Sequence, residues 1–151
     1  MSQPEPPPER PSLTASALRT LLESGRTIAV VGLSPTPGRP SYEVARYLRD
    51  AGFAIVPVNP HHDTVLGERS YPTLTAAARD HALDIIDVFR RSEFVGEIVD
   101  EALALRPLPK LIWLQVGVLD APACARAYGA GVPCVMDRCL MAAHRRLDSL
   151  T

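Results

Sequence analysis

The loop after the first apolar run carries residue types that bind phosphate. Residues 27–32 (TIAVVG) lead into LSPTPGRPS, where Gly32 allows a tight turn, Ser34 offers a hydroxyl group and Arg39 offers a guanidinium. A helical pattern begins near Ser41, and the free N–H groups of a helix N-terminus attract anions. These residues predict a pyrophosphate cradle, although three prolines and a longer loop replace the usual G-x-G-x-x-G. The alternative is a rigid surface loop whose glycines only form turns.

The second apolar run ends in VNPHH, a less common sequence for a dinucleotide site. Such sites usually place Asp or Glu here to bind the ribose hydroxyls. Asn59, the only asparagine in the chain, brings no negative charge and would not repel a ribose that carries a phosphate, and Pro60 follows it. His61 and His62 are either phosphate contacts or solvent-exposed loop histidines. An adjacent pair without a matching distant ligand motif does not indicate a metal site.

Further candidates follow the third, fourth and fifth apolar runs. Phe89 could pack against an adenine or a pantetheine, or could simply end the core of its strand. Arg90 could meet a phosphate. Gly117 would let the backbone approach a ligand, or would only shape a turn. Asp137 is interpreted as a helix cap rather than an acid catalyst.

Cys139 lies two residues after Asp137. A helix N-terminus and Arg138 would favour its thiolate, whereas Asp137 would oppose it. The thiol is therefore either reactive or inert and half-buried. With Cys124 and Cys134 the chain has three cysteines and no C-x-x-C spacing, so the sequence predicts neither a disulfide framework nor a zinc site.

Motifs of catalysis are absent from the sequence. There is no G-x-x-x-x-G-K-[ST] phosphate loop, no G-x-S-x-G nucleophile elbow and no Cys/His pair at a familiar spacing. Asp84, Asp87 and Glu93 flank the third apolar run, but Asp84 and Asp87 fall on opposite faces and ends of it, which argues against paired-carboxylate chemistry. The sequence predicts a binding crevice with no catalytic residues.

Alternating strand and helix patterns must position these residues. Near-continuous apolar runs predict buried parallel strands, and segments with a 3.6-residue period lie between them. The result is an α/β fold, a Rossmann-like doubly wound, five-stranded parallel sheet with strand order 3-2-1-4-5 and helices on both faces. Residues 64–71 form a hairpin or a loop. The expected strands are 27–32, 53–58, 84–89, 110–115 and 133–136; the expected first and last helices are 12–24 and 138–149; the expected helix caps are Ser41, Thr73, Ser92, Asp120 and Asp137.

Composition limits the classes of partner. Five of the 15 prolines lie in residues 1–11, which we expect to be a disordered Pro-rich tail before a single domain at 12–151. The net charge of -1, without a basic run, indicates neither nucleic-acid binding nor membrane-surface binding. No export signal is visible, which predicts a cytoplasmic protein.

Six stretches in order carry a family resemblance. The chain resembles the small, stand-alone CoA-binding proteins of Rossmann type, which are related to the CoA-binding domain of the succinyl-CoA synthetase α-subunit and of NDP-forming acyl-CoA synthetases. The stretches lie between Val30 and Leu147: VVGLSPTPGRPSYEVARYL, VPVNP, LGERSYPTL, DIIDVFRR, LIWLQVGV and VMDRCLMAAHRRL.

The resemblance implies how a ligand would lie. The loop 32–41 would hold the pyrophosphate and ribose phosphate of CoA, with Ser34 and Arg39 as leading polar contacts. The resemblance also implies contacts to the nucleotide from Asn59, Pro60, Phe89 and Arg90. It implies contacts to the pantetheine arm from residues Gln115 to Gly117.

Non-catalytic binding of coenzyme A or acyl-CoA is the function predicted from these residues and this resemblance. The synthetases phosphorylate a histidine and need further domains, whereas His144 lies in the expected terminal helix, so their activity is not carried over. One alternative is a redox-responsive CoA carrier or sensor that forms a mixed disulfide at Cys139. Another is an NAD(P)-binding enzyme on the same fold: the missing acid after the second strand argues against NAD, and Arg39 leaves an opening for NADP. The sequence does not predict a particular protein partner.

Overall fold

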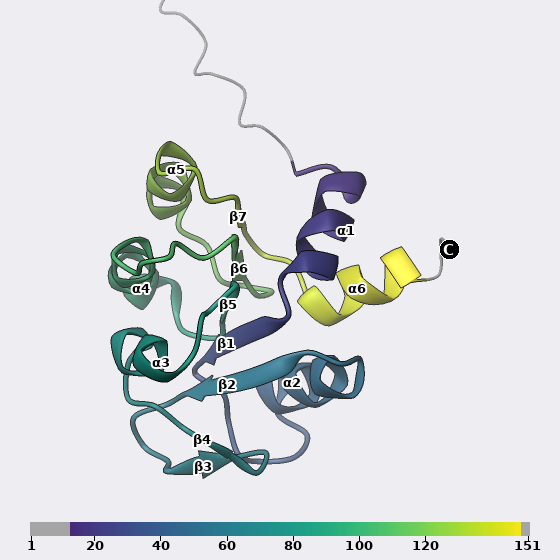
Figure 1. The fold of residues 1–151 in the computed structure, drawn as a ribbon, viewed down its shortest axis with the longest axis vertical. Helices are drawn as coiled ribbons and strands as arrows, with labels where there is room; N and C mark the ends of the chain where they lie inside the picture. Colours follow the sequence, from purple (N-terminus) through teal and green to yellow (C-terminus); the bar gives the residue numbers. More distant parts are fainter. Residues whose placement is uncertain (1–12, 149–151) are drawn as a thin grey trace, which may run out of the picture.

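Five short strands form a parallel sheet at the centre of the protein. The structure is a computed structural model and describes residues 13–148, so the expected tail at 1–11 lies outside the described residues. The fold class is confirmed, and each strand lies within its predicted range (Figure 1). The strands are β1 (Thr27–Val31), β2 (Ala54–Val58), β5 (Ile85–Val88), β6 (Leu111–Leu114) and β7 (Cys134–Val135).

The predicted strand order is wrong. The sheet runs β2-β1-β5-β6-β7, which is 2-1-3-4-5 when the five strands are counted along the chain. Tyr71 occupies the outer edge of β2, where the predicted order would place the third strand: its backbone N–H donates to the Pro57 carbonyl at 3.0 Å, and its carbonyl accepts from the Asn59 N–H at 2.9 Å. Pro57 also lacks the N–H that a second neighbouring strand would need, as is typical of an edge strand.

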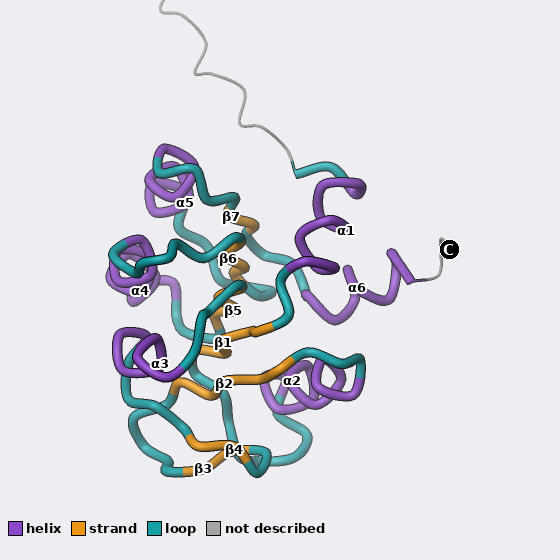
Figure 2. Tube along the Cα trace, in the orientation of Figure 1, coloured by secondary structure: helices purple, strands orange, loops and turns teal. Residues whose placement is uncertain are grey.

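Within residues 13–148, three helices cover each face of the sheet, as the doubly wound prediction required; Figures 1 and 2 show their arrangement. On one face, buried residues of three helices pack on Ala29, Ile86 and Ile112; on the other, they pack on Ile28 and Trp113. The first face carries α3 (Leu74–Asp80), α4 (Val95–Leu103) and α5 (Ala121–Gly129); the second carries α1 (Ala15–Ser24), α2 (Pro40–Asp50) and α6 (Leu140–Asp148).

The irregular insertion at 64–71 contains a hairpin. Strands β3 (Thr64–Val65) and β4 (Glu68–Arg69) pair antiparallel beside the outer edge of β2. Leu66 and Gly67 have φ values of 54° and 74°, the left-handed conformations that a tight two-residue hairpin turn requires.

Two of the five predicted caps are confirmed and three are wrong. Thr73 and Asp120 accept hydrogen bonds from the first turns of α3 and α5. Ser41, Ser92 and Asp137 instead hold neighbouring loops at the carboxyl edge of the sheet. Their side-chain oxygens accept hydrogen bonds from the backbone N–H groups of Ser34, Leu119 and Gly117, respectively.

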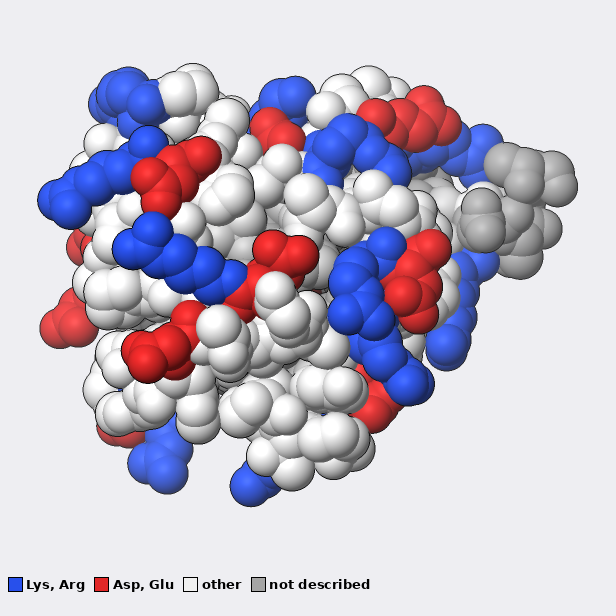
Figure 3. All heavy atoms as spheres, turned by 60° about the horizontal axis from the view of Figure 1, so that its bottom comes forward, with Lys and Arg blue, Asp and Glu red and all other residues white. Residues whose placement is uncertain are grey.

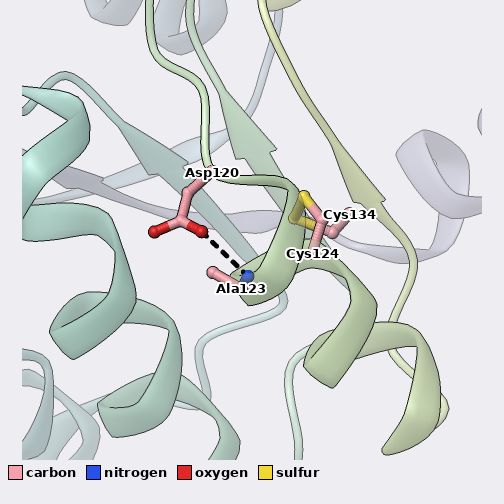
Figure 4. Close-up of a disulfide and its surroundings, with 4 residues drawn as sticks. All are labelled: Asp120, Ala123, Cys124 and Cys134. Atoms are coloured by element: carbon pink, nitrogen blue, oxygen red, sulfur yellow. Dashed lines mark hydrogen bonds between the residues drawn. A yellow bond between two sulfur atoms is a disulfide. The ribbon is translucent and has the colours of Figure 1, made fainter.

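One disulfide was not predicted from the sequence. It joins Cys124 of α5 to Cys134 of β7, whose Cα atoms lie 5.2 Å apart, beside the Asp120 cap (Figure 4). Both cysteines belong to the core under α3, α4 and α5. Among the described cysteines, Cys139 is left as a free, half-buried thiol.

Surface charge is mixed rather than segregated on the face drawn in Figure 3. On the face drawn in Figure 3, basic and acidic side chains alternate, in keeping with the net charge of -1. Within residues 13–148, no helix combines the length and apolar character needed to cross a bilayer. The same part of the chain contains no cluster of three residues able to ligate a metal.

Candidate functional site

The carboxyl ends of β1 and β5 define the centre of the candidate site. In the observed order the chain leaves β1 toward β2 on one side, while β5 lies on the other, so the loops diverge and leave a crevice at this switch point. Gly32 directly follows β1 and has φ of 84°. A Cβ atom at Gly32 would lie 2.5 Å from the Phe89 carbonyl oxygen, so only glycine lets the two strand ends approach this closely.

The first cavity lies between the loop after β1, the start of α2 and the end of β5. Its volume is about 440 Å³. Five residues that the sequence predicted for the site line this cavity. Of the two adjacent histidines, His62 also lines it and His61 does not. The lining residues are Gly32, Ser34, Pro35, Thr36, Arg39, Pro40, Ser41, His62 and Phe89.

Hydrogen bonds from the loop backbone fix the shape of the first cavity. The Ser34 N–H donates to Ser41 Oγ at 2.9 Å, and the Thr36 N–H donates to Ser34 Oγ at 3.1 Å. The Gly38 N–H donates to Glu43 Oε1 at 2.9 Å, which ties the far end of the loop to α2. Both serine oxygens therefore act as acceptors, and each hydroxyl keeps its own O–H for an anionic ligand.

The N-terminus of α2 gives the first cavity its positive character. Pro40 starts this 11-residue helix, and Arg39 occupies the cap position without a side-chain cap bond. The unpaired N–H groups of the first turn carry partial positive charge. Arg39 is exposed and makes no ion pair with any described residue, so its guanidinium is available to an anion. Glu43, in the same turn, is engaged by Gly38 and by Arg46 at 2.8 Å.

A second cavity lies on the other side of Gly32. Its volume is about 210 Å³, and it contains the predicted residues Pro60 and Arg90. The Arg90 guanidinium lies over the Phe94 ring, 4.7 Å from the ring centroid. The remaining lining residues come mostly from the ends of β1 and β2 and from α3 and α4: Val31, Val58, Pro72, Thr73, Leu74, Glu97, Ile98 and Glu101.

Asn59 shapes the loops around both cavities. Its Nδ2 donates to the Leu33 carbonyl at 2.9 Å, and its Oδ1 accepts from the His61 N–H at 2.9 Å. One amide side chain thus holds the loop after β1 against the loop after β2. The sequence predicted Asn59 as a border of the nucleotide, and the internal bonds give it a structural task at that border.

Gln115 and Gly117 lie beside the crevice rather than among the residues that line the two cavities. Gln115 is buried, and its Nε2 donates to Asp87 Oδ1 at 2.7 Å. The Gly117 N–H donates to Asp137 Oδ1 at 2.6 Å, and the residue has φ of 82°. The loop after β6 is therefore held by one carboxylate from β5 and one from the segment after β7.

Asp87 is the residue whose environment the sequence did not foresee. It is fully buried, and its Oδ2 has no hydrogen-bond partner among the described residues. Burial raises the pKa of Asp87 from 3.8 to about 7, against the opposing effect of the Gln115 hydrogen bond. Asp84 lies at the amino end of the strand, where its carboxylate accepts from the Arg26 and Thr27 N–H groups. The two acids are thus separated, as their spacing predicted.

Cys139 immediately precedes α6, and its carbonyl accepts from the Ala143 N–H at 3.0 Å. Asp137 does not cap this helix, which corrects the predicted relation between the two residues. Cys139 and Phe89 both pack against the core beneath α1, α2 and α6. The thiol is therefore on the same face of the sheet as the first cavity.

Fold and crevice define the class: a Rossmann-like, doubly wound α/β protein with paired cavities at its switch point. Comparison with known proteins then gives the family. The chain belongs to the CoA binding domain family, whose model matches residues 26–145.

The chain is also similar to individual known proteins. The chain is 35% identical over 127 residues to the uncharacterized protein YneT of Bacillus subtilis, covering 84% of this chain and 91% of that protein. It is 30% identical over 63 residues to an ADP-forming acetate–CoA ligase of Methanocaldococcus jannaschii, covering 42% of this chain and 9% of the ligase. A solved structure of a hypothetical protein from Pyrococcus horikoshii matches with a TM-score of 0.84 and 31% identity, covering 97% of this chain and 99% of that one.

Proposed function

We propose that the protein binds coenzyme A or an acyl-CoA at the switch-point crevice without transforming it. The observation that carries the proposal is the first cavity: Arg39 without an ion pair among described residues, two serine hydroxyl groups and the N-terminus of α2 surround one space. A pyrophosphate is the anion that this combination suits, because backbone N–H groups and a guanidinium both bind phosphate oxygens. Membership of the CoA binding domain family supports the choice of ligand.

The remaining parts of the ligand follow from the chemistry of the crevice. Phe89 offers a flat apolar surface in the first cavity, and Arg90 offers a second cation in the second. His62 lines the same cavity as Arg39, where it would contact the ribose phosphate that distinguishes CoA from dephospho-CoA. The pantetheine arm would run past Gln115 and Gly117, which follow β6.

The proposal contains no chemical step. The chain aligns with only 9% of the length of the acetate–CoA ligase, so we do not propose that enzyme's activity for this protein. An NAD(P)-dependent enzyme on the same fold is less well supported, because Asn59 replaces the acid that would bind ribose hydroxyls and both ends of its amide are engaged. Absorbance-monitored hydride transfer would reveal such an enzyme.

Calorimetry with CoA, dephospho-CoA and NAD tests the proposal. We expect CoA to bind most tightly, and Arg39→Ala to weaken CoA binding. Arg79→Ala is the matched control, because it removes an arginine on α3 that lines a different cavity, away from the switch point. Tighter binding of NAD, or no binding of CoA, would contradict the proposal.

A second candidate is a CoA carrier or sensor that uses the Cys139 thiol, which lies on the same face as the first cavity. In this reaction the Cys139 thiolate attacks CoA disulfide, the CoA S–S bond breaks, a protein–CoA disulfide forms and one CoA thiolate leaves. Intact mass spectrometry after incubation with CoA disulfide would detect the adduct. An adduct that persists in Cys139→Ser, or no adduct in the wild type, would contradict this candidate.

A further inference from the structure

A buried carboxylate lies directly beneath the floor of the crevice. Asp87 is central in the sheet, paired in register with β1 on one side and β6 on the other. The ladder bonds continue one residue past these strands, so the next row toward the carboxyl edge contains Gly32, Phe89 and Gln115. Side chains two residues apart on a strand share a face. Asp87 therefore lies two rows below Gln115, on the face that carries Phe89, where its carboxylate contacts the Gln115 amide.

The bond between these two side chains selects one orientation of an amide. The distance from Gln115 Nε2 to Asp87 Oδ1 is 2.7 Å. A side-chain amide has a donor end and an acceptor end of almost equal shape, and an apolar neighbour would not distinguish them. Because Oδ1 of Asp87 accepts, the Nε2 end must turn inward. The acceptor Oε1 is then the end of the Gln115 amide that Asp87 leaves free for a ligand that extends beyond the two cavities.

A carboxylate at position 87 lowers the stability of the folded protein. Its Oδ2 is buried and has no hydrogen-bond partner among the described residues. An unsatisfied buried polar atom destabilises a protein, whereas an aliphatic side chain would join the apolar residues around it without that loss. Among the described residues, the contact with Gln115 is the hydrogen bond that the Asp87 carboxylate makes.

We propose that Asp87 is a positioning residue for ligand binding: it holds the amide of Gln115 so that Oε1 accepts a hydrogen bond from an amide N–H of the pantetheine arm. This role rests on the proposed binding of CoA. It predicts a contact that depends on pantetheine and is absent for a ligand that ends at the nucleotide.

The experiment compares CoA with adenosine 3′,5′-bisphosphate, which lacks the pantetheine arm. Dissociation constants are measured by calorimetry for the wild type, Asp87→Leu, Asp87→Asn, Gln115→Met and the Asp87→Leu/Gln115→Met double variant. Asp50→Asn is the control, because Asp50 ends α2 at its far end from the crevice and is exposed. Thermal melting of each variant reports whether it folds.

We expect Asp87→Leu and Gln115→Met each to weaken CoA binding about fivefold, the worth of one hydrogen bond. Asp87→Asn, which lets the amide adopt both orientations, should weaken it only about twofold. The double variant should match Gln115→Met, because both changes remove the same contact. Binding of adenosine 3′,5′-bisphosphate should stay unchanged throughout.

Wild-type affinity for CoA in Asp87→Leu, or an equal loss for both ligands, would overturn the positioning role and leave CoA binding intact. If the Asp87 variants do not fold, Gln115→Met alone decides, and unchanged CoA affinity in that variant overturns the role. A wild type that binds no CoA would overturn both the proposed function and this inference.

Discussion

Replacing Asp87 with asparagine should change how the stability of the protein depends on pH. Asp87 lies in the middle of the sheet and is fully buried. Asparagine keeps an oxygen that can accept the hydrogen bond from Gln115, and it removes the ionisable group. The substitution therefore separates the effect of charge from the effect of shape at one position.

The magnitude follows from the raised pKa of Asp87, from 3.8 to about 7 in the folded protein. The folded state holds this proton more tightly than the unfolded state, so the free energy of unfolding falls as pH rises from about 4 to about 7 and is level above that range. One pKa unit corresponds to about 1.4 kcal/mol, which gives about 4 kcal/mol for the whole range. Between pH 5 and pH 8 the remaining loss is about 3 kcal/mol.

The asparagine variant should lack this loss. Its Nδ2 would replace an oxygen that has no partner among the described residues, at a cost of about 1–3 kcal/mol that does not depend on pH. The informative quantity is consequently the change, between pH 5 and pH 8, in the stability difference between variant and wild type. Relative to the wild type, we expect Asp87→Asn to be about 3 kcal/mol more stable at pH 8 than at pH 5.

Urea unfolding at pH 5, 6, 7 and 8 measures this quantity, with circular dichroism as the signal and the same m-value required of both proteins. Asp50→Asn, which removes an exposed carboxylate, is the control and should show no such trend. A stability difference between Asp87→Asn and wild type that stays the same at pH 5 and pH 8 would refute the reasoning, because Asp87 would then titrate alike in the folded and unfolded states.

Three further predictions concern the crevice and the disulfide. Gly32→Ala should lower the free energy of unfolding by about 1–3 kcal/mol or more, measured by urea unfolding, because φ is 84° and the new Cβ would meet the Phe89 carbonyl. Arg39→Ala should weaken CoA binding about tenfold in calorimetry without changing the melting temperature, because the side chain is exposed and charge-assisted hydrogen bonds are worth about 1.5–3 kcal/mol. The Cys124→Ser/Cys134→Ser double variant should be less stable than the oxidised wild type by about 2–3 kcal/mol, because the disulfide closes a short loop.

Each of these has a matched control. Gly38→Ala also replaces a glycine with positive φ, but a Cβ there meets nothing within 4 Å, so it should be the milder change. An Arg39→Lys variant should recover part of the affinity, since it restores charge without the planar guanidinium. In reducing buffer the disulfide variant should match the wild type; a persistent difference would mean that the serine hydroxyls, rather than the missing bond, cause the loss.

The strands could be predicted because each is a near-continuous run of apolar residues, and such runs are recognisable without tertiary information. The order of the strands could not be obtained from the runs themselves. Pro57 was the available signal: a proline within a strand indicates an edge, and order 3-2-1-4-5 would have made that strand internal. The Tyr71 bridge to the same strand has no such sequence signature.

Some features of the site could likewise be predicted from the sequence, and others could not. Gly32, Ser34, Arg39 and Phe89 come together because the carboxyl ends of parallel strands meet at one edge of a sheet, which follows from the order of elements. The contact between Asp87 and Gln115 depends on the strand register, and the disulfide depends on the packing of α5 on β7. Ser41 carried a misleading signal, since a serine near a helix start is typical of a cap and here it holds Ser34.

Both borders of the central sheet disfavour the addition of further strands. On the β2 side, Tyr71 is hydrogen-bonded along the border and the neighbouring proline offers no donor. On the other side, β7 is only two residues long and is tethered to a helix through Cys134. Short, covered or proline-containing borders resist the addition of a strand from another molecule. Copies of this protein should therefore not join into a continuous sheet, and any self-association would have to use helix or loop surfaces.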